Sequence, residues 1–432
     1  MCMIEKFILN EKKSDRQNVI WNMVATITNS FQSMLILLVL TQLQDLKGAS
    51  YIAIGYASAN LLMTIGKFGV RNYQVTDVRE ENSFSAYVIC RFCTLILMLV
   101  GAIIYGSYCF LFRNYSIDKL FVVELLCLNK MVESFEDVFH GRLQQIGKLH
   151  IGSKIWAIRN IVFILGFTLL FILTQNLVFT LVINDFVTII LAFFLNSIPR
   201  KFYGTYDKVN YKRCIKILAS CFSIAIATFL LMYISNAPKY IIDSVVSDEE
   251  QAKINVLLMV IYVVTLLSNF IFNPLINKMA IWYENGSYKT LLKQLSIISA
   301  SVIFIVLFGI GFAEIIGRSL LGWIYRIDLD VYHIELLLVI ISGGFIALIN
   351  LYYLIIIMLR KQYIFYSVFG VASVILYLFG KRILLTYDFY GLCLFYILIL
   401  FGIVQILIIC SWYNLTRQYR KNAEIITNNK IH

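Results

Sequence analysis

A cation, a carboxylate and an amide follow one another at the end of a long apolar run. Residues 217–238 carry no charge and are enough to span a bilayer, so Lys239 and Asp243 lie close to the membrane boundary or inside it. On a helix Asn236, Lys239 and Asp243 share one face, and Lys239 and Asp243 are able to pair. Pro238 removes one backbone donor, which leaves upstream carbonyls free to face a cavity or a cation. These residues indicate a transport site, or else a lysine that reaches the membrane surface beside a neutralising aspartate.

The composition is that of an integral membrane protein. Of the 432 residues 60% are hydrophobic and 14% are charged, whereas the usual charged share is about a quarter. The formal charge of +12 is spread between apolar runs and forms no continuous basic patch, so the lipid bilayer and not nucleic acid is the expected partner. The first sixteen residues lack the apolar core of a cleavable signal peptide, so the first span is expected to remain as an anchor.

Nine cysteines are scattered along the chain, most of them within apolar runs. Cys90 and Cys93 have a C-x-x-C spacing, but there is no second pair, and none of the four histidines is close in sequence. We interpret them as ordinary helix residues and expect no metal site and no cofactor.

Charge-free windows of about 20 residues mark the membrane spans. The predicted spans lie at 17–44, 48–66, 92–112, 120–139, 151–174, 177–197, 214–243, 255–277, 291–313, 336–359, 362–380 and 389–414. A basic stretch with Gly204 separates the sixth span from the seventh. The sequence therefore predicts an all-α integral membrane protein, with about twelve transmembrane helices in two six-helix bundles related by pseudo-two-fold symmetry. The predicted domains are a first bundle at 1–198, a cytoplasmic linker at 199–213, a second bundle at 214–416 and a cytoplasmic tail at 417–432.

The fourth predicted span is interrupted by charges, at Glu124, Lys130, Glu133, Glu136 and Asp137. A helix with these side chains in lipid would be unstable. If the segment spans the membrane, its polar stripe must face protein or water.

Lysines and arginines are distributed unequally between alternate connections. The set that includes both termini holds 23 of them, and the opposite set holds nine. Because cytoplasmic loops carry the excess of positive charge, both termini are predicted to be cytoplasmic.

Three stretches resemble a known transporter family. Residues 68–77, FGVRNYQVTD, are similar to a Phe-Gly-x-Arg-x-Tyr-Gln-x-Ser/Thr-Asp pattern, and residues 236–243, NAPKYIID, to Asn-x-Pro-Arg/Lys-Tyr-x-x-Asp. Asn273-Pro274 followed by residues 282–286, WYENG, fits a third element. With these motifs the chain resembles the bacterial polysaccharide flippases of the multidrug/oligosaccharidyl-lipid/polysaccharide exporter superfamily. Many relatives carry an arginine near the end of the first span, where this chain has Thr41-Gln42.

The resemblance implies a flippase and not an enzyme. Its substrate would be an undecaprenyl-pyrophosphate-linked oligosaccharide for O-antigen or capsule, moved across the bacterial cytoplasmic membrane by alternating access. A polysaccharide polymerase and other assembly proteins are candidate partners. An H+ or Na+ gradient could drive the cycle.

Such a substrate requires a hydrated cavity lined by cations, since guanidinium and ammonium groups bind phosphate. The candidate cations are Arg91, Lys154, Arg159, Lys216 and Lys239. Arg91, Lys154 and Lys216 lie near cytoplasmic helix ends, where we favour extension of the side chain to the membrane surface over substrate binding. Arg159, two turns into its span, and Lys239 with its neighbour Asn236 are the stronger candidates for substrate binding.

Carboxylates within the spans could couple transport to an ion gradient, because a buried carboxyl can exchange protons at accessible pH. The candidates are Glu124, Glu133, Asp185 and Asp243. Mutual neutralisation of Lys130 and Glu133, three residues apart, is the alternative.

Arg71 and Asp77 belong to the first motif and lie in a predicted cytoplasmic loop. Contact with the substrate is not expected there. We interpret the two residues as a conformational gate that locks helices together.

Two other functions fit parts of the pattern. A cation-coupled drug antiporter of the same fold would place acids deep in the first half without many cations, whereas Arg159 and Lys239 accompany the acids here. A polyprenyl-dependent polymerase or glycosyltransferase would need acids on a sizeable external loop. The predicted external connections are short, and the acids at 248–250 are more typical of a solvated helix start.

Overall fold

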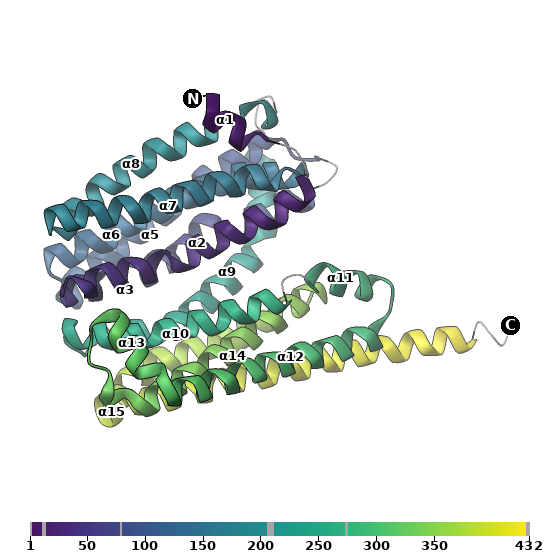
Figure 1. The fold of residues 1–432 in the computed structure, drawn as a ribbon. Coiled ribbons are helices and arrows are strands. Elements are labelled where there is room, and N and C mark those ends of the chain that lie inside the picture. Colours follow the sequence, from purple (N-terminus) through teal and green to yellow (C-terminus); the bar gives the residue numbers. More distant parts are fainter. Residues whose placement is uncertain (1, 11–13, 78–79, 205–210, 273–274, 429–432) are drawn as a thin grey trace. The chain divides into compact units, whose positions relative to one another are not determined.

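The computed structural model consists of helices throughout the residues that it describes (Figure 1). These residues are 2–10, 14–77, 80–204, 211–272 and 275–428. They form two compact units, Met1–Tyr233 and Ile234–His432. The boundary falls inside one long helix, α9 (Tyr211–Ile242). The predicted all-α membrane class is confirmed.

The first unit is a helical bundle with a charged helix at its centre. Its elements are α1 (Cys2–Ile8), α2 (Ser14–Gln42), α3 (Leu46–Lys67), α4 (Val70–Thr76), α5 (Phe84–Phe112), α6 (Ile117–Gln145), α7 (Leu149–Thr174), α8 (Leu177–Ser197) and the 3-10 turn η1 (Arg200–Phe202). Helix α6 packs against α3, α4, α5, α7 and α8. The helix with the most charges among the predicted spans is therefore the one enclosed by the others, as its polar stripe requires.

The second unit is organised around an apolar helix. Its elements are α10 (Asp248–Phe272), α11 (Ile276–Glu284), α12 (Tyr288–Phe312), the π-helical turn η3 (Ala313–Gly317), α13 (Arg318–Tyr325), the 3-10 turn η4 (Asp330–Tyr332), α14 (His333–Met358) and α15 (Tyr363–Asn428). Helix α14 packs on α10, α12 and α15. A Cβ atom at Gly343 would lie 2.9 Å from Cβ of Val264, so the missing side chain lets α14 approach α10 closely.

Twelve helices are counted as spans within the described residues. Nine segments are long and apolar enough to cross a membrane. Helix α15 is one of these segments, and non-helical backbone at Tyr387 and Asp388 divides it into two spans. Helices α3 and α6 are long enough to complete the twelve, and neighbouring helices cover much of their surface.

Two predicted helix starts are wrong for the same reason. Helix α5 begins at Phe84 and not at 92, and α10 begins at Asp248 and not at 255. A charge-free window ends at the nearest charged residue, although a helix can include a charged residue at a suitable position. Arg91 is buried against protein, and the acids of α10 occupy its first turn, where the helix dipole favours negative charge. The predicted Asn273-Pro274 element and residues 205–210 of the predicted linker lie outside the described residues.

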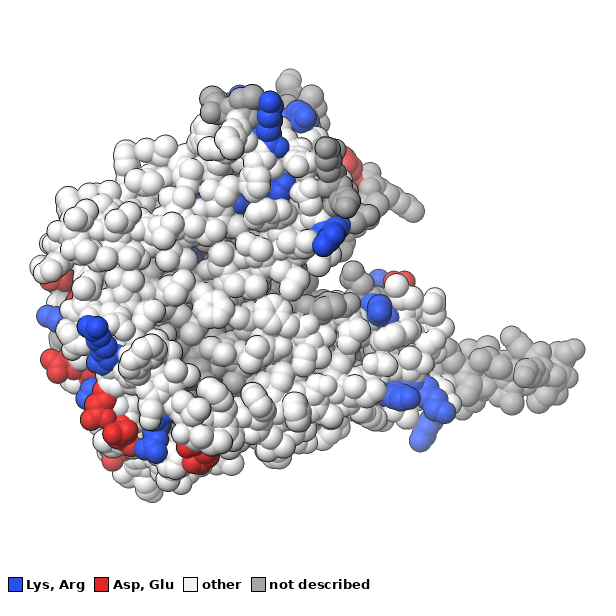
Figure 2. All heavy atoms as spheres, viewed as in Figure 1, with Lys and Arg blue, Asp and Glu red and all other residues white. Residues whose placement is uncertain are grey.

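Charged side chains gather at helix ends in each unit, and the helix flanks between them are uncharged on the face shown in Figure 2. Large apolar side chains are exposed along these flanks, for example Leu173 at 78% and Phe304 at 69%. Apolar surface of this extent is stable in lipid and not in water. The chain is a multi-pass membrane protein, and the cytoplasmic position of its termini remains a prediction.

Candidate functional site

Three carboxylates on one face of α6 hold the first unit together. Glu136 and Asp137 follow Glu133 by three and four residues and therefore lie on the same side of the helix as Glu133. Glu133 accepts from Lys67 of α3 and from Lys130 of α6 itself, each at 2.7 Å. The alternative that Lys130 and Glu133 neutralise one another is therefore realised, with Lys67 as a second cation.

Asp137 binds two arginines from two other helices. Arg91 of α5 donates to it at 2.7 Å, and Arg71 of α4 donates at 3.1 Å. Arg91 also donates to the carbonyl of Gly66, and Arg71 donates to Gln144 at 2.8 Å. The expected extension of Arg91 to the membrane surface is wrong, because its side chain is fully buried and faces a carboxylate.

Glu136 pairs with Arg159 of α7, the cation that the sequence favoured together with Lys239. Arg159 Nε lies 2.7 Å from Glu136 Oε2, and both side chains are 1% exposed. Asn196 of α8 donates to the other carboxylate oxygen at 2.8 Å. The contact between Nε and Oε2 does not meet the geometry of a hydrogen bond. None of the three guanidinium nitrogens of Arg159 makes a hydrogen bond within the described residues. In this conformation Arg159 neutralises a neighbour inside the bundle.

Asp185 of α8 is buried and makes no ion pair among the described residues, although the charge of Arg159 acts on it. Asn129 of α6 donates to one of its oxygens at 3.1 Å, and its second oxygen has no hydrogen-bond partner in the described part of the chain. The hydroxyl of Tyr56 and the amide of Asn160 are likewise buried without partners there. Tyr56 lies within electrostatic reach of Asp185 and Arg159. Buried polar atoms in such number are typical of a place where water or an ion binds.

The other coupling candidates do not join this cluster. Glu124 is half-buried and lies against Gly106 of α5. Asp243, at the end of α9 in the second unit, accepts from Gln251 at 3.2 Å. Of the two fully buried coupling candidates, Asp185 has one polar partner among the described residues and Glu133 has two.

Asp77 follows α4 and orders the turn that leads to α5. It accepts hydrogen bonds from the Tyr87 hydroxyl at 2.8 Å and from the backbone amides of Glu81 and Asn82. Burial raises the pKa of this carboxyl, but the hydrogen bonds outweigh burial and hold the pKa below its usual range. Asp77 and Arg71 therefore have separate partners, and the motif that contains both ties α4 to α5 and α6.

Pro238 lies inside α9 and leaves one backbone carbonyl without its helical donor. Pro238 lacks an amide hydrogen, which leaves the carbonyl of Ile234, four residues earlier, without its helical donor. The hydroxyl of Tyr396, from α15, donates to this carbonyl at 3.0 Å. Pro238 was predicted to free upstream carbonyls for a cavity or a cation, but one of them instead accepts a hydrogen bond from a tyrosine of α15.

Lys239 follows Pro238 directly and is 6% exposed. Its ammonium lies 4.9 Å from the ring centroid of Tyr262 of α10, whose hydroxyl donates to Asn236 at 2.5 Å. The predicted pair with Asp243 does not form, and Lys239 makes no ion pair within the described residues. Among the described residues of this unit it is the one buried Lys, Arg, Asp or Glu.

The remaining two cation candidates lie apart from both places. Lys154 is 2% exposed and donates to the carbonyls of Phe7 and Asn10 at 3.0 and 3.5 Å, so its expected extension to the membrane surface is wrong. Lys216 is exposed on α9. Neither residue touches the cluster around α6.

Sequence reasoning missed several partners in these two places. The spacing of 133, 136 and 137 could have shown that Glu136 shares the face of Glu133. No comparable sequence signal pointed to Tyr56, Tyr262 or Tyr396. A tyrosine in an apolar helix has the same sequence pattern whether it faces lipid or the backbone of another helix.

No family model and no curated protein matches the sequence. Solved structures do match over nearly the full chain. An outward-facing multidrug resistance MATE family transporter of the MOP superfamily has a TM-score of 0.60, with 11% identity, and the match covers 96% of this chain and 98% of that one. The chain has the fold of the MATE transporters. An inward-facing MATE family transporter matches with a TM-score of 0.56 and 10% identity, over 92% of this chain and 99% of that one. A MOP superfamily transporter from Pyrococcus furiosus, described by a reversed polarity of its binding pocket, has a TM-score of 0.53 and 12% identity, with 96% and 98% covered.

The Arg159–Glu136 pair allows a test of the ionic core. We expect Glu136→Leu and Arg159→Met each to destabilise the protein by about 3–5 kcal/mol, because each leaves one buried charge uncompensated. The double variant removes both charges and is expected to recover most of the loss. Thermal unfolding of the purified protein in detergent measures the effect.

The half-exposed pair Glu250–Lys253, 3.8 Å apart, is the matched control. Replacement of both residues by glutamine should change stability by less than about 1 kcal/mol. A double variant of Arg159 and Glu136 no more stable than the single variants would contradict the ionic role.

Proposed function

We propose that this chain is a membrane transporter that works by alternating access and carries an anionic amphiphile, a polyprenyl-pyrophosphate-linked oligosaccharide. The fold supports the first part, since its neighbours include inward-facing and outward-facing MATE transporters. No covalent bond changes in such a cycle. The polymerase and glycosyltransferase alternatives gain no support, since the acids at 248–250 form the first turn of α10.

The observation that carries the choice of substrate is the isolation of Lys239. A buried cation without a counterion is costly, and a site built for a charged ligand accepts this cost because the ligand supplies the missing charge. Asn236 lies one turn away and Tyr262 supports both residues, so an anion at Lys239 would meet a donor amide as well. A pyrophosphate has the charge that fits this place.

Two buried cations of the first unit also support Lys239 as the residue that binds the phosphates, because these cations already have carboxylate partners. Arg91 and Arg159 were candidates for substrate binding, but each faces an α6 carboxylate. We assign both arginines to the scaffold. Lys239 and Asn236 are then the residues of this chain that recognise the phosphates.

A drug/cation antiporter is the second candidate, because two of the matching structures are multidrug resistance transporters. An organic cation would be repelled by Lys239 and attracted by Asp185. The two functions therefore differ in the sign of the charge that the substrate carries.

Substitution of Lys239 separates the two candidates. In proteoliposomes, Lys239→Gln is expected to slow translocation of a fluorescent polyprenyl-pyrophosphoryl sugar by about tenfold or more, since a hydrogen bond to a charged group contributes about 1.5–3 kcal/mol. Lys239→Arg should retain most of the rate because it keeps the charge. Lys216→Gln, at an exposed lysine of the same helix, is the control and should leave the rate unchanged.

Two results together would favour the antiporter. The unmodified protein would not move the lipid-linked sugar, and Lys239→Gln would leave the transport of organic cations unchanged or accelerate it.

Asp185 is expected to couple the cycle to an ion gradient. Asp185→Asn keeps the bond with Asn129 and removes the charge that would bind H+ or Na+. Transport driven by a pH or Na+ gradient across the liposome should then fall to the rate measured without a gradient. Glu124→Gln, at a half-buried acid away from Asp185, should keep the response. A gradient response that survives Asp185→Asn and disappears in Glu124→Gln would place coupling at Glu124 instead.

A further inference from the structure

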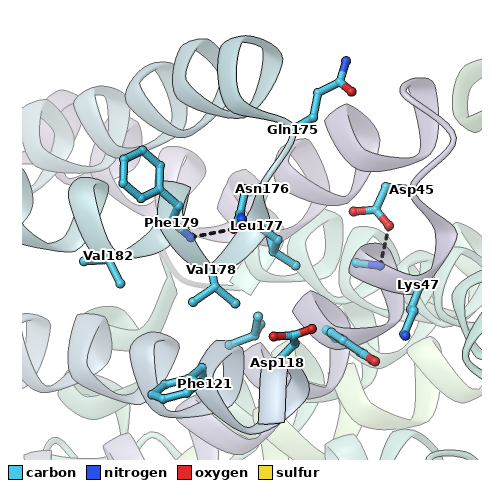
Figure 3. A pocket seen from close by; sticks show the side chains of 13 residues that line it. Asp45, Lys47, Asp118, Phe121, Gln175, Asn176, Leu177, Val178, Phe179 and Val182 are labelled. Carbon is cyan, nitrogen blue, oxygen red and sulfur yellow. Dashed lines mark hydrogen bonds between the residues drawn. The ribbon is translucent and has the colours of Figure 1, made fainter. Parts of the chain in front are cut away.

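A cavity lies at one end of the first unit, where three helices begin. The connections before α3, α6 and α8 meet there and surround a volume of about 580 Å³ (Figure 3). Its polar lining includes Asp45, Lys47, Asp118, Gln175 and Asn176 from these three helix starts, and Tyr51 lies one turn further along α3. It contains none of the residues assigned above to the ionic core.

Two of the polar side chains also stabilise the helix starts. Asp45 accepts from the backbone amide of Gly48 at 2.8 Å, and Asn176 accepts from that of Phe179 at 3.0 Å (Figure 3). Asp118 and Lys47 make no ion pair in the described part of the chain. The cavity thus presents two carboxylates and one ammonium group.

The rest of the cavity is apolar and follows α6 and α8. Phe121 of α6 is 53% exposed, and Phe179 and Val182 of α8 are 51% and 48% exposed. Figure 3 shows these side chains along the two helices, beyond the polar helix starts. In a membrane-spanning bundle, the helix ends face the headgroups and the helix flanks face the acyl chains. The cavity is therefore polar at headgroup level and apolar below it.

We propose that this cavity binds a phospholipid whose headgroup carries a primary ammonium. The ammonium would lie between Asp45 and Asp118 and the phosphate near Lys47, while one acyl chain would cover Phe121 and Phe179. Two carboxylates and one cation complement a headgroup with one positive and one negative charge. By the predicted orientation, this lipid belongs to the outer leaflet. The inference does not depend on the transported substrate.

Other occupants fit less well. A phospholipid with an uncharged alcohol headgroup is a net anion and would be repelled by the two carboxylates. A choline headgroup has no N–H to donate to them. A free oligosaccharide could bond the polar end but would leave the apolar wall uncovered.

Native mass spectrometry of the full-length protein tests the proposal. The protein would be titrated with phosphatidylethanolamine, phosphatidylglycerol and phosphatidylcholine that have identical acyl chains. We expect phosphatidylethanolamine to bind about threefold to tenfold more tightly than the other two, the range expected for partly exposed charge pairs. Asp45→Asn with Asp118→Asn should abolish this preference, and asparagine at 45 keeps the helix cap.

Two further variants make the result decisive. Glu249→Gln with Glu250→Gln removes the same charge at another helix start and should leave the preference intact. Val182→Trp, at a half-exposed position of the apolar wall, should weaken all three lipids. Equal affinity of the three lipids for the unmodified protein, or a preference that survives Asp45→Asn with Asp118→Asn, would overturn the proposal. Binding of a neutral oligosaccharide that is lost in the same double variant would overturn it as well.

Discussion

The first unit depends on the pairing of three α6 carboxylates with five cations. Glu133, Glu136 and Asp137 lie on one face of a helix that five other helices contact, and the cations come from α3, α4, α5, α6 and α7. A charge transferred from water to hydrocarbon without a partner is far too costly to retain. Each carboxylate therefore fixes where its neighbouring helices must lie, and removal of one partner leaves the other uncompensated.

The second unit is built in a different way. Its central helix α14 is apolar and approaches α10 closely at Gly343, so packing and not charge sets the distances. Lys239 differs from the rest of this unit. Its side chain is buried, and it makes no ion pair within the described residues. Pro238 shapes the helix around it, and Tyr396 and Tyr262 fix the backbone and the side chains. The α6 carboxylates of one unit are thus compensated, whereas the described part of the other unit contains one buried cation without an ion-pair partner.

The sequence predicted the class of fold and most of the helices, because length and hydropathy are set by the bilayer. It also predicted that the charged stripe of α6 would be enclosed. It failed for Arg91 and Lys154, which were expected to reach the membrane surface, since position near a helix end does not reveal a buried partner on another helix. The expected Lys239–Asp243 pair failed for a related reason: four-residue spacing permits contact, but Asp243 accepts from Gln251 across the turn. Partners that are distant in sequence could be identified only from the fold. Tyr396, which donates to the carbonyl that Pro238 leaves without a helical donor, is an example.

The central claim is that Lys239, and not Arg159, meets the phosphates of the substrate. Solid-state NMR of protein with ¹⁵N-labelled lysine and arginine side chains measures this by ¹⁵N–³¹P dephasing, compared in liposomes with and without a polyprenyl-pyrophosphoryl sugar. A charge-assisted contact would put Lys239 Nζ about 4 Å from phosphorus. The account predicts that the sugar lipid adds dephasing to one lysine signal, identified by its absence from Lys239→Gln. Dephasing confined to an arginine signal that disappears in Arg159→Met would contradict the account.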